Sequence, residues 1–169
     1  MGKRFIICIV VLLLLCCKTN DDPSSTCQGT INYGPPGIFL IELVDSEGNN
    51  LVENGYYIDE QIMARLNGAI LSEDLINNTY TDVQNVITLF AVGNEGPNQY
   101  LIDLSETETD TLDFTLEFIE VEQLVDESLF CGTKAVLASV NYNQTEVDIT
   151  SISQDSLSPI NITAIKNIN

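Results

Sequence analysis

The chain has 169 residues, and its 25 acidic residues outnumber its six basic residues to give a net charge of −19. It contains no histidine, which excludes Ser-His-Asp and Cys-His nucleophile pairs and histidine-ligated zinc sites. So large an acidic excess also disfavours nucleic acid or an anionic lipid surface as a partner, because both need clustered lysine and arginine.

An apolar segment near the amino terminus has the organisation of a secretory signal. Lys3 and Arg4 precede eleven apolar or thiol residues, Phe5–Leu15, which is the order of charged and apolar regions in a signal peptide. A helix of that length spans about 16 Å, roughly half of a hydrocarbon core, so it is too short to stay as a membrane span. We therefore assign residues 1–16 to a signal peptide.

The end of this segment carries a cysteine pair. Leu14-Leu15-Cys16-Cys17 resembles the lipobox of bacterial lipoproteins, which implies that Cys17 is acylated after cleavage and anchors the protein to a membrane, with Cys16 as the alternative anchor. Acyl chains contribute about 0.8 kcal/mol per buried methylene, so two or three of them hold a protein stably. The competing interpretation is an ordinary secretory leader cut elsewhere, although no A-x-A-like site lies near residue 20.

Residues 17–37 have the composition of a flexible tether. Asp, Pro, Ser, Thr and Gly are frequent, and the segment ends in Gly34-Pro35-Pro36-Gly37. The stretch Lys18–Asp22 is similar to the export signals of Bacteroidota lipoproteins, which implies the outer membrane, at the cell surface or on the periplasmic face. A solvated acidic tether explains the same residues.

Few cysteines remain after the leader. Removal of residues 1–16 leaves 153 residues with four basic and 25 acidic side chains, a net charge of −21, and this length suits one domain. Besides Cys17, the remaining thiols are Cys27 and Cys131. In an oxidising compartment we expect them to form a disulfide that closes a long loop; two free buried thiols are the alternative.

The body, residues 38–169, shows the patterns of short strands separated by turns. Residues 38–44 and 86–92 are continuous apolar runs, as in strands buried on both faces. Alternating apolar and polar residues predict half-buried strands at 62–66, 69–71, 100–104, 112–118, 136–142, 147–149 and 160–164. Turn signals separate them at Asp45–Asn50, Asn67-Gly68, Gly96-Pro97-Asn98 and Asn143-Gln144.

Two strands have inward residues that can be specified. The pattern places Leu112, Phe114, Leu116 and Phe118 inward, and the apolar positions then switch to odd numbers at Ile119, so we expect a bulge or a strand end there. In the strand 136–142 the pattern places the even-numbered residues inward, which are Val136, Ala138, Val140 and Tyr142.

The run Ile41–Gly68, with its "D-x-x-G-N-x-L…N-G" spacing, is similar to small flavobacterial lipoproteins. The resemblance includes a late Cys131-Gly132 paired with an early cysteine, and it implies an Ig-like or prealbumin-like sandwich. Together with the strand count, which is eight or nine, it predicts an all-β fold with a single antiparallel β-sandwich over residues 38–169. It implies no activity, because sandwiches serve many functions.

Acidic clusters are candidates for cation binding. Asp45–Asn50 lacks EF-hand spacing, so we interpret it as a hairpin turn. Glu106, Glu108 and Asp110 are spaced by two, so an extended chain puts them on one face, with Asp103 nearby. That arrangement either holds a divalent cation or protects an edge strand from aggregation, and we favour edge protection. We therefore expect no metal site.

Other surface chemistry is suggested by short motifs. Asp110-Thr111-Leu112 and Asp155-Ser156-Leu157 match the D-[ST]-aliphatic pattern that resembles the O-glycosylation acceptor of Bacteroidota envelope proteins, with Ser156 the better candidate. Tyr56, Tyr57 and Tyr100 are able to stack on a sugar if exposed, but tyrosines in sandwiches mostly pack in the core.

These patterns favour a non-catalytic, lipid-anchored binding or accessory module with a protein or glycan partner. No phosphate-binding glycine loop occurs, so we expect no nucleotide or other cofactor. One alternative is a glycan-acting enzyme that uses carboxylates alone, which requires two carboxylates facing each other across a cleft. Another is a cation-binding structural surface protein.

Overall fold

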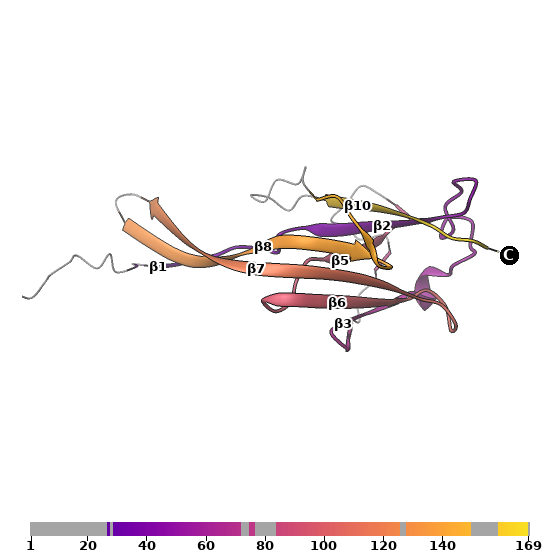
Figure 1. Cartoon of the computed structure of the whole chain (residues 1–169), viewed down its shortest axis with the longest axis horizontal. Helices are drawn as coiled ribbons and strands as arrows, with labels where there is room; N and C mark the ends of the chain where they lie inside the picture. Colours follow the sequence, from indigo (N-terminus) through magenta and orange to yellow (C-terminus); the bar gives the residue numbers. More distant parts are fainter. Residues whose placement is uncertain are drawn as a thin grey trace, which may run out of the picture. The chain divides into compact units, whose positions relative to one another are not determined.

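The structure, a computed structural model, describes Cys27 and residues 29–71, 75–76, 84–125, 128–149 and 159–168. In these residues the chain is nearly all β, with two sheets and a single-turn 3-10 helix, η1 (Asp59–Gln61), which confirms the predicted all-β class (Figure 1). The expected signal peptide, Cys17 and Ser156 lie outside the described residues. The described part of the chain contains no helix with the length and apolarity needed to cross a membrane.

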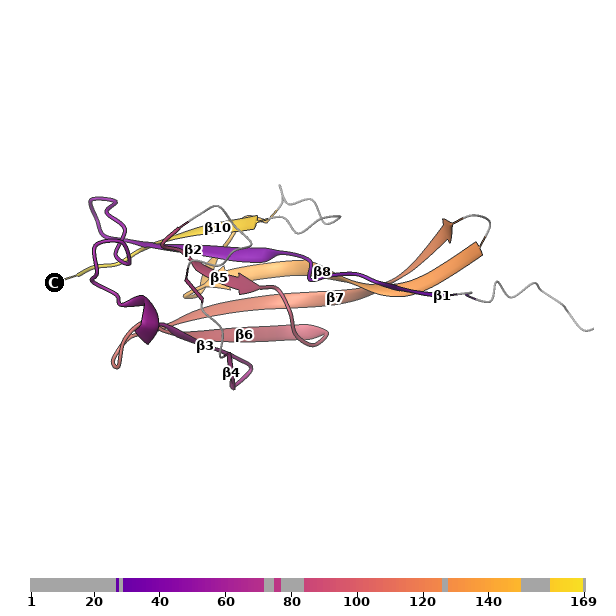
Figure 2. The ribbon, with the colours of Figure 1, turned by 180° about the vertical axis from the view of Figure 1, so that it is seen from behind.

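The larger sheet has seven strands and is curled. Six of them lie in the spatial order β1 (Gly29–Asn32), β8 (Ser128–Tyr142), β7 (Thr109–Val125), β6 (Gly96–Asp103), β3 (Met63–Leu66) and β4 (Ala69–Leu71), and β9 (Thr145–Glu146) pairs with β8. The smaller sheet has the order β10 (Pro159–Ile165), β2 (Ile38–Val44) and β5 (Ile87–Phe90). Both ribbon views show β2 and β10 side by side (Figures 1 and 2).

The smaller sheet corrects one prediction. We expected an antiparallel sandwich, but β10 pairs with β2 in parallel over seven residues, from Pro159 opposite Ile38 to Ile165 opposite Val44. Parallel neighbours need a long connection, and here nearly the whole body separates the two strands. The first and last strands of the body therefore lie together, with β2 central and β10 at the edge of its sheet.

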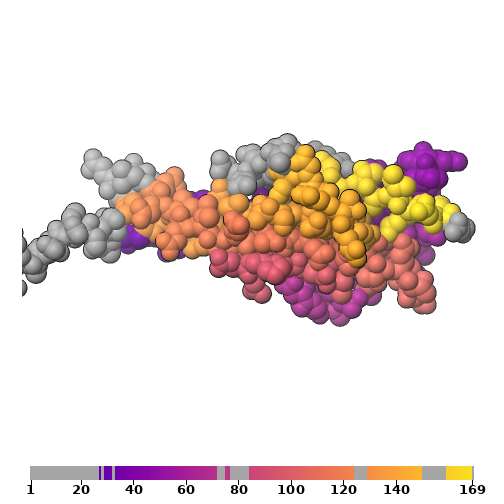
Figure 3. Space-filling model, viewed as in Figure 1, coloured from indigo at the N-terminus to yellow at the C-terminus, as the bar shows by residue number. Residues whose placement is uncertain are grey.

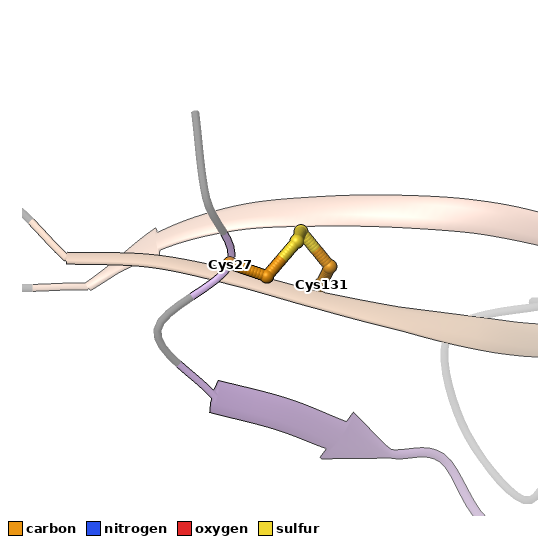
Figure 4. Close-up of a disulfide and its surroundings, with 2 residues drawn as sticks. All are labelled: Cys27 and Cys131. Carbon is orange, nitrogen blue, oxygen red and sulfur yellow. A yellow bond between two sulfur atoms is a disulfide. The ribbon is translucent and has the colours of Figure 1, made fainter. Parts of the chain in front are cut away.

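Contacts divide the chain into two compact units, Met1–Thr30 with Glu122–Cys131 and Ile31–Val121 with Gly132–Asn169. In the first unit, Cys27 and Cys131 are joined in a disulfide with their Cα atoms 5.5 Å apart, as expected (Figure 4). In the second, β1 continues to Asn32, inside the range that we expected to be a flexible tether. A side chain on Gly132 would collide with the carbonyl oxygen of Ile31, so the close approach of β1 requires glycine there.

The larger of two hydrophobic clusters in the described residues of the second unit lies between the two sheets. Phe39, Ile41 and Leu43 of β2 are fully buried and belong to the same cluster as residues of β5, β6, β7 and β10. Phe114 stacks on Tyr100 at a centroid distance of 5.6 Å and lies 5.3 Å from Phe39. Because the two sheets share this core, burial of both inner faces holds them together.

The inward residues of the two long strands differ partly from the pattern. Leu112, Phe114 and Leu116 are buried as predicted, but Phe118 is 40% exposed, and β7 continues beyond it to Val125. In β8, Leu137 is buried in place of Ala138, whereas Val140 and Tyr142 are buried as predicted. The buried positions of β8 therefore change from odd to even numbers between Leu137 and Val140. The apolar and polar pattern of the sequence did not predict this one-residue shift.

The turn signals were mostly correct. Asn67 and Gly68 have φ of 48° and 88° and join β3 to β4, while Asn143 and Gln144 have φ of 47° and 68° and join β8 to β9. Positive φ at both central residues is the two-residue hairpin geometry that matches strand twist. The expected turn at Gly96-Pro97-Asn98 is wrong, because β6 already begins at Gly96.

Removal of the disulfide should destabilise the protein. It links residues 104 positions apart, and in the chain-entropy model a loop of about 100 residues is worth up to about 4.7 kcal/mol. We expect Cys27→Ala/Cys131→Ala to lower the free energy of unfolding by about 2–5 kcal/mol in urea denaturation. A reductant should lower the stability of the wild type and leave that of the double variant unchanged; equal stability of reduced and oxidised wild type would contradict the prediction.

Candidate functional site

A charged cluster lies inside the second unit where the sheets meet. We call it the lysine clasp, and its members are Tyr57, Glu108, Asp110, Tyr142, Asn143 and Lys166. Lys166 directly follows β10 of the smaller sheet, whereas Asp110 and Tyr142 belong to β7 and β8 of the larger sheet. The cluster therefore joins the last strand of the chain to the opposite sheet.

Lys166 lies between two carboxylates. Its Nζ donates to Asp110 Oδ1 at 2.5 Å and to Glu108 Oε1 at 2.9 Å. The side chains of Lys166 and Asp110 are only 11% and 5% exposed. Because a buried charge without a partner is costly, each of these ions depends on the other.

Further hydrogen bonds are donated to both carboxylates. Tyr142 donates its hydroxyl hydrogen to Asp110 Oδ2, and Asn143 Nδ2 donates to Asp110 Oδ1 at 2.9 Å. The hydroxyl of Tyr57 donates to Glu108 Oε2 at 2.7 Å. All four carboxylate oxygens of the clasp are therefore satisfied, as a buried polar network requires.

Local backbone geometry explains how these side chains converge. Glu108 lies just before β7 and Asp110 is its second residue, so the two side chains are two residues apart and point to the same side as Leu112. Asn143 occupies the left-handed turn after β8; its backbone N–H donates to Thr111 O at 2.9 Å, and its Oδ1 accepts from Thr111 N at 2.7 Å. The N–H of Lys166 donates to Val44 O at 2.7 Å, continuing the pairing of β10 with β2.

The tyrosines of the clasp are held as neutral donors. Burial raises the pKa of Tyr142, and its hydrogen bond to Asp110 raises it further. Burial likewise raises the pKa of Tyr57, with a further contribution from Glu108. Outside the clasp, burial raises the pKa of Tyr100 to about 12, and the Tyr100 hydroxyl donates to Phe90 O at 2.8 Å.

This geometry corrects the interpretation of the acidic run. β7 lies between β8 and β6, so the run does not protect an edge strand. Glu106 is exposed in the turn before β7, and Glu108 and Asp110 pair with the ammonium group of Lys166. Asp103 instead pairs with Arg65 at 2.8 Å. Within the described ranges, no three or more His, Cys, Asp or Glu side chains are grouped so that they could hold a metal ion.

The other predicted residues are placed as follows. Asp45–Asn50 forms the predicted turn, in which Asp45 Oδ1 accepts from the backbone N–H groups of Glu47 at 2.8 Å and Asn49 at 2.9 Å. Thr111 is half-buried within β7 and paired on both sides, so it lies in a strand rather than in a loop. Tyr57 and Tyr100 are buried in the core, as tyrosines in sandwiches usually are, whereas Tyr56 is 52% exposed.

A groove adjoins the clasp. It has a volume of about 430 Å³ and runs between six successive residues of the chain, 161–166, and the end of the β8–β9 hairpin, where Asn143, Thr145 and Glu146 line it. The end of the hairpin and β10 come to the surface beside each other, in orange and yellow (Figure 3). We call this the edge groove.

Sequence reasoning singled out Glu108 and Asp110 but missed Lys166, Tyr57, Tyr142 and Asn143 as their partners. One signal was present: only four basic residues follow residue 16, against 25 acidic ones. Where cations are so scarce, a lysine next to an apolar strand is a strong candidate for a buried ion pair. The acid with which it would pair was not determined by the sequence.

Comparisons with known proteins identify no relative: no family model, no curated protein and no solved structure matches this chain.

The lysine clasp should contribute far more stability than a surface ion pair. Lys166→Met leaves Asp110 buried without its cation, so we expect the free energy of unfolding to fall by about 3–5 kcal/mol. Arg65→Met is the matched control, because Arg65 is 37% exposed and, among the described residues, forms its ion pair with Asp103; we expect it to cost less than about 1 kcal/mol. Urea denaturation measures both. Equal losses for the two variants would show that the clasp is not a buried, interdependent network.

Alkaline pH should destabilise the protein through its buried tyrosines. Their pKa values are higher in the folded than in the unfolded state, so the folded state holds their protons more tightly. This stabilisation is complete below about pH 10 and is lost as pH rises through the folded value, which for Tyr100 is about 12.

We expect the tyrosinate absorbance of these residues to appear together with unfolding. Tyr142→Phe removes one of the three contributions, so its stability should fall less steeply above pH 10 than that of the wild type. Ionisation of all six tyrosines in the intact fold would contradict this prediction.

Proposed function

We propose that this protein is a lipid-anchored lipoprotein of the bacterial outer membrane whose β-sandwich is a non-catalytic binding or accessory module. The observation that carries the proposal is the sequence Leu14-Leu15-Cys16-Cys17 at the end of an apolar run preceded by Lys3 and Arg4. Cys17 is the residue to be acylated.

The composition of the body supports a role at a membrane rather than within it. A net charge of −21 after residue 16 keeps the exported body away from anionic lipid headgroups. Cys27, the first described residue, is ten positions beyond Cys17, and a chain of that length spans at most about 35 Å. A lipid on Cys17 would therefore hold Cys27 within about 35 Å of the membrane surface.

The arrangement of the body supports an Ig-like or prealbumin-like sandwich as the finer description. Two sheets share one core, and two-residue hairpin turns join β3 to β4 and β8 to β9. The parallel pair formed by β2 and β10 departs from the antiparallel arrangement that we expected.

The clasp supports a binding rather than a hydrolytic role. A glycan hydrolase of the carboxylate type needs two carboxyl groups about 5–10 Å apart across a cleft, with room for substrate or water between them. Glu108 and Asp110 have Lys166 Nζ between them, and their remaining oxygens accept hydrogen bonds from Tyr57 and Tyr142. Each oxygen of this pair therefore already accepts a hydrogen bond, and a lysine ammonium lies where substrate or water would have to enter.

Substitution of Cys17 tests the anchor. We expect Cys17→Ser to remove the acyl chains, seen by mass spectrometry of the amino-terminal peptide, and to shift the protein from the membrane to the soluble fraction. Cys16→Ser is the matched control, because it keeps a small residue before the anchor and should leave acylation unchanged.

Protease treatment of intact cells, followed by mass spectrometry, then distinguishes surface display from the periplasmic face. An unacylated mature chain in the culture fluid, or fractionation that Cys17→Ser does not change, would refute the proposal.

A further inference from the structure

β10 is an edge strand of the smaller sheet. β10 has seven residues, and no described strand pairs with the side of it that faces away from β2. The other end of its sheet is different: β5 is partly covered there by a bridge between Ile76 and Ile87 and by a hydrogen bond from Thr88 N to Leu75 O at 2.8 Å. In the larger sheet, the edge strands β1 and β4 have only four and three residues.

The backbone of β10 presents its free side to the edge groove. Lys166 N–H donates to Val44 O, and successive residues of a strand direct their backbone groups to opposite sides. The N–H and C=O groups of Asn161, Thr163 and Ile165 therefore point away from β2. The groove is lined by every residue from 161 to 166, as expected of a wall formed by a strand edge rather than by alternate side chains.

Beyond Pro159 at its start, this edge lacks the usual protection against strand pairing. Native proteins protect long edges with charged side chains, bulges or proline. The outward side chains of β10 after Pro159 are Asn161, Thr163 and Ile165, none of them charged, and Ile165 is 68% exposed. In a chain with 25 acidic residues, an uncharged run at this edge permits the approach of another strand.

The charges around the edge groove indicate which kind of partner strand would be attracted to it. Glu146 and Lys166 are the charged residues that line the groove, and Glu42 of β2 lies next to Thr163 in register. The lysine clasp has one positive charge against two negative charges, so it is net negative as well. A second copy of this chain would bring another 19 net negative charges, whereas an extended segment rich in lysine or arginine would be attracted.

We propose that the edge of β10 binds an extended, positively charged segment of a partner protein by β-strand addition. Main-chain hydrogen bonds to Asn161, Thr163 and Ile165 provide the affinity, and the surrounding carboxylates provide the preference for basic sequences. This inference rests on the proposed function, since it names the partner class of the binding module. Peptide binding in solution needs no lipid, so it is tested separately from the anchor.

The probe is a fluorescent peptide of about nine residues that alternates lysine and valine, long enough to cover β10. Two control peptides separate the two sources of recognition. One has glutamate in place of lysine, and the other has N-methyl groups at alternate residues, which remove the backbone donors. With the purified full-length chain, we expect the lysine peptide to bind and both control peptides to bind at least about tenfold more weakly.

Thr163→Pro tests the location of the site. Its N–H faces the open edge, so proline should leave the pairing of β10 with β2 intact and block the added strand. We expect binding to weaken at least about tenfold, while Thr163→Val, which keeps the N–H, should bind like the wild type. If Thr163→Pro does not fold, Thr163→Lys replaces it, since a positive charge on the edge should repel the same peptide.

Several results would overturn the proposal. Absence of binding, equal binding of the lysine and glutamate peptides, or unchanged binding by a folded Thr163→Pro variant would each exclude it. A dimer in sedimentation that Thr163→Pro dissociates would assign the edge to a second copy of the chain instead.

Discussion

The ion pair between Lys166 and two carboxylates, those of Glu108 just before β7 and Asp110 within it, is the interaction on which the arrangement of the body depends. Lys166 directly follows β10, and its Nζ lies 2.5 Å from Asp110 Oδ1 and 2.9 Å from Glu108 Oε1. The ion pair therefore ties the end of β10 to the start of β7 in the larger sheet. Hydrophobic burial holds the two sheets together but is non-directional, so it does not fix which residues of the sheets meet. The clasp does fix a specific contact, because the buried charge of Lys166 is stable only next to its carboxylate acceptors.

This constraint links the fold to the proposed surface. With Lys166 fixed, β10 pairs with β2 on one side and turns its other side toward the end of the β8–β9 hairpin. The edge groove is therefore formed by the same contacts that satisfy the buried charges. A binding surface that lies on rigid, mutually supported elements loses little conformational freedom when a partner is added.

The sequence was informative where local chemistry decides the structure. Asn67-Gly68 and Asn143-Gln144 specify left-handed turns, alternation identified β3 and β10, and two lone cysteines in the body predicted the disulfide. It failed where distant residues decide. The parallel pairing of β10 with β2, the one-residue shift in β8 and the cation that neutralises Asp110 all depend on tertiary contacts that no local pattern records.

Hydrogen exchange of the β10 amides in the Lys166→Met variant is the most direct measurement of the central claim. If the clasp fixes the last strand, the even-numbered amides of β10, which bond to β2, should lose protection, while the amides shared by β3 and β6 keep theirs. Unchanged protection in β10, or an equal loss in all strands, would show that the clasp does not determine the position of that strand.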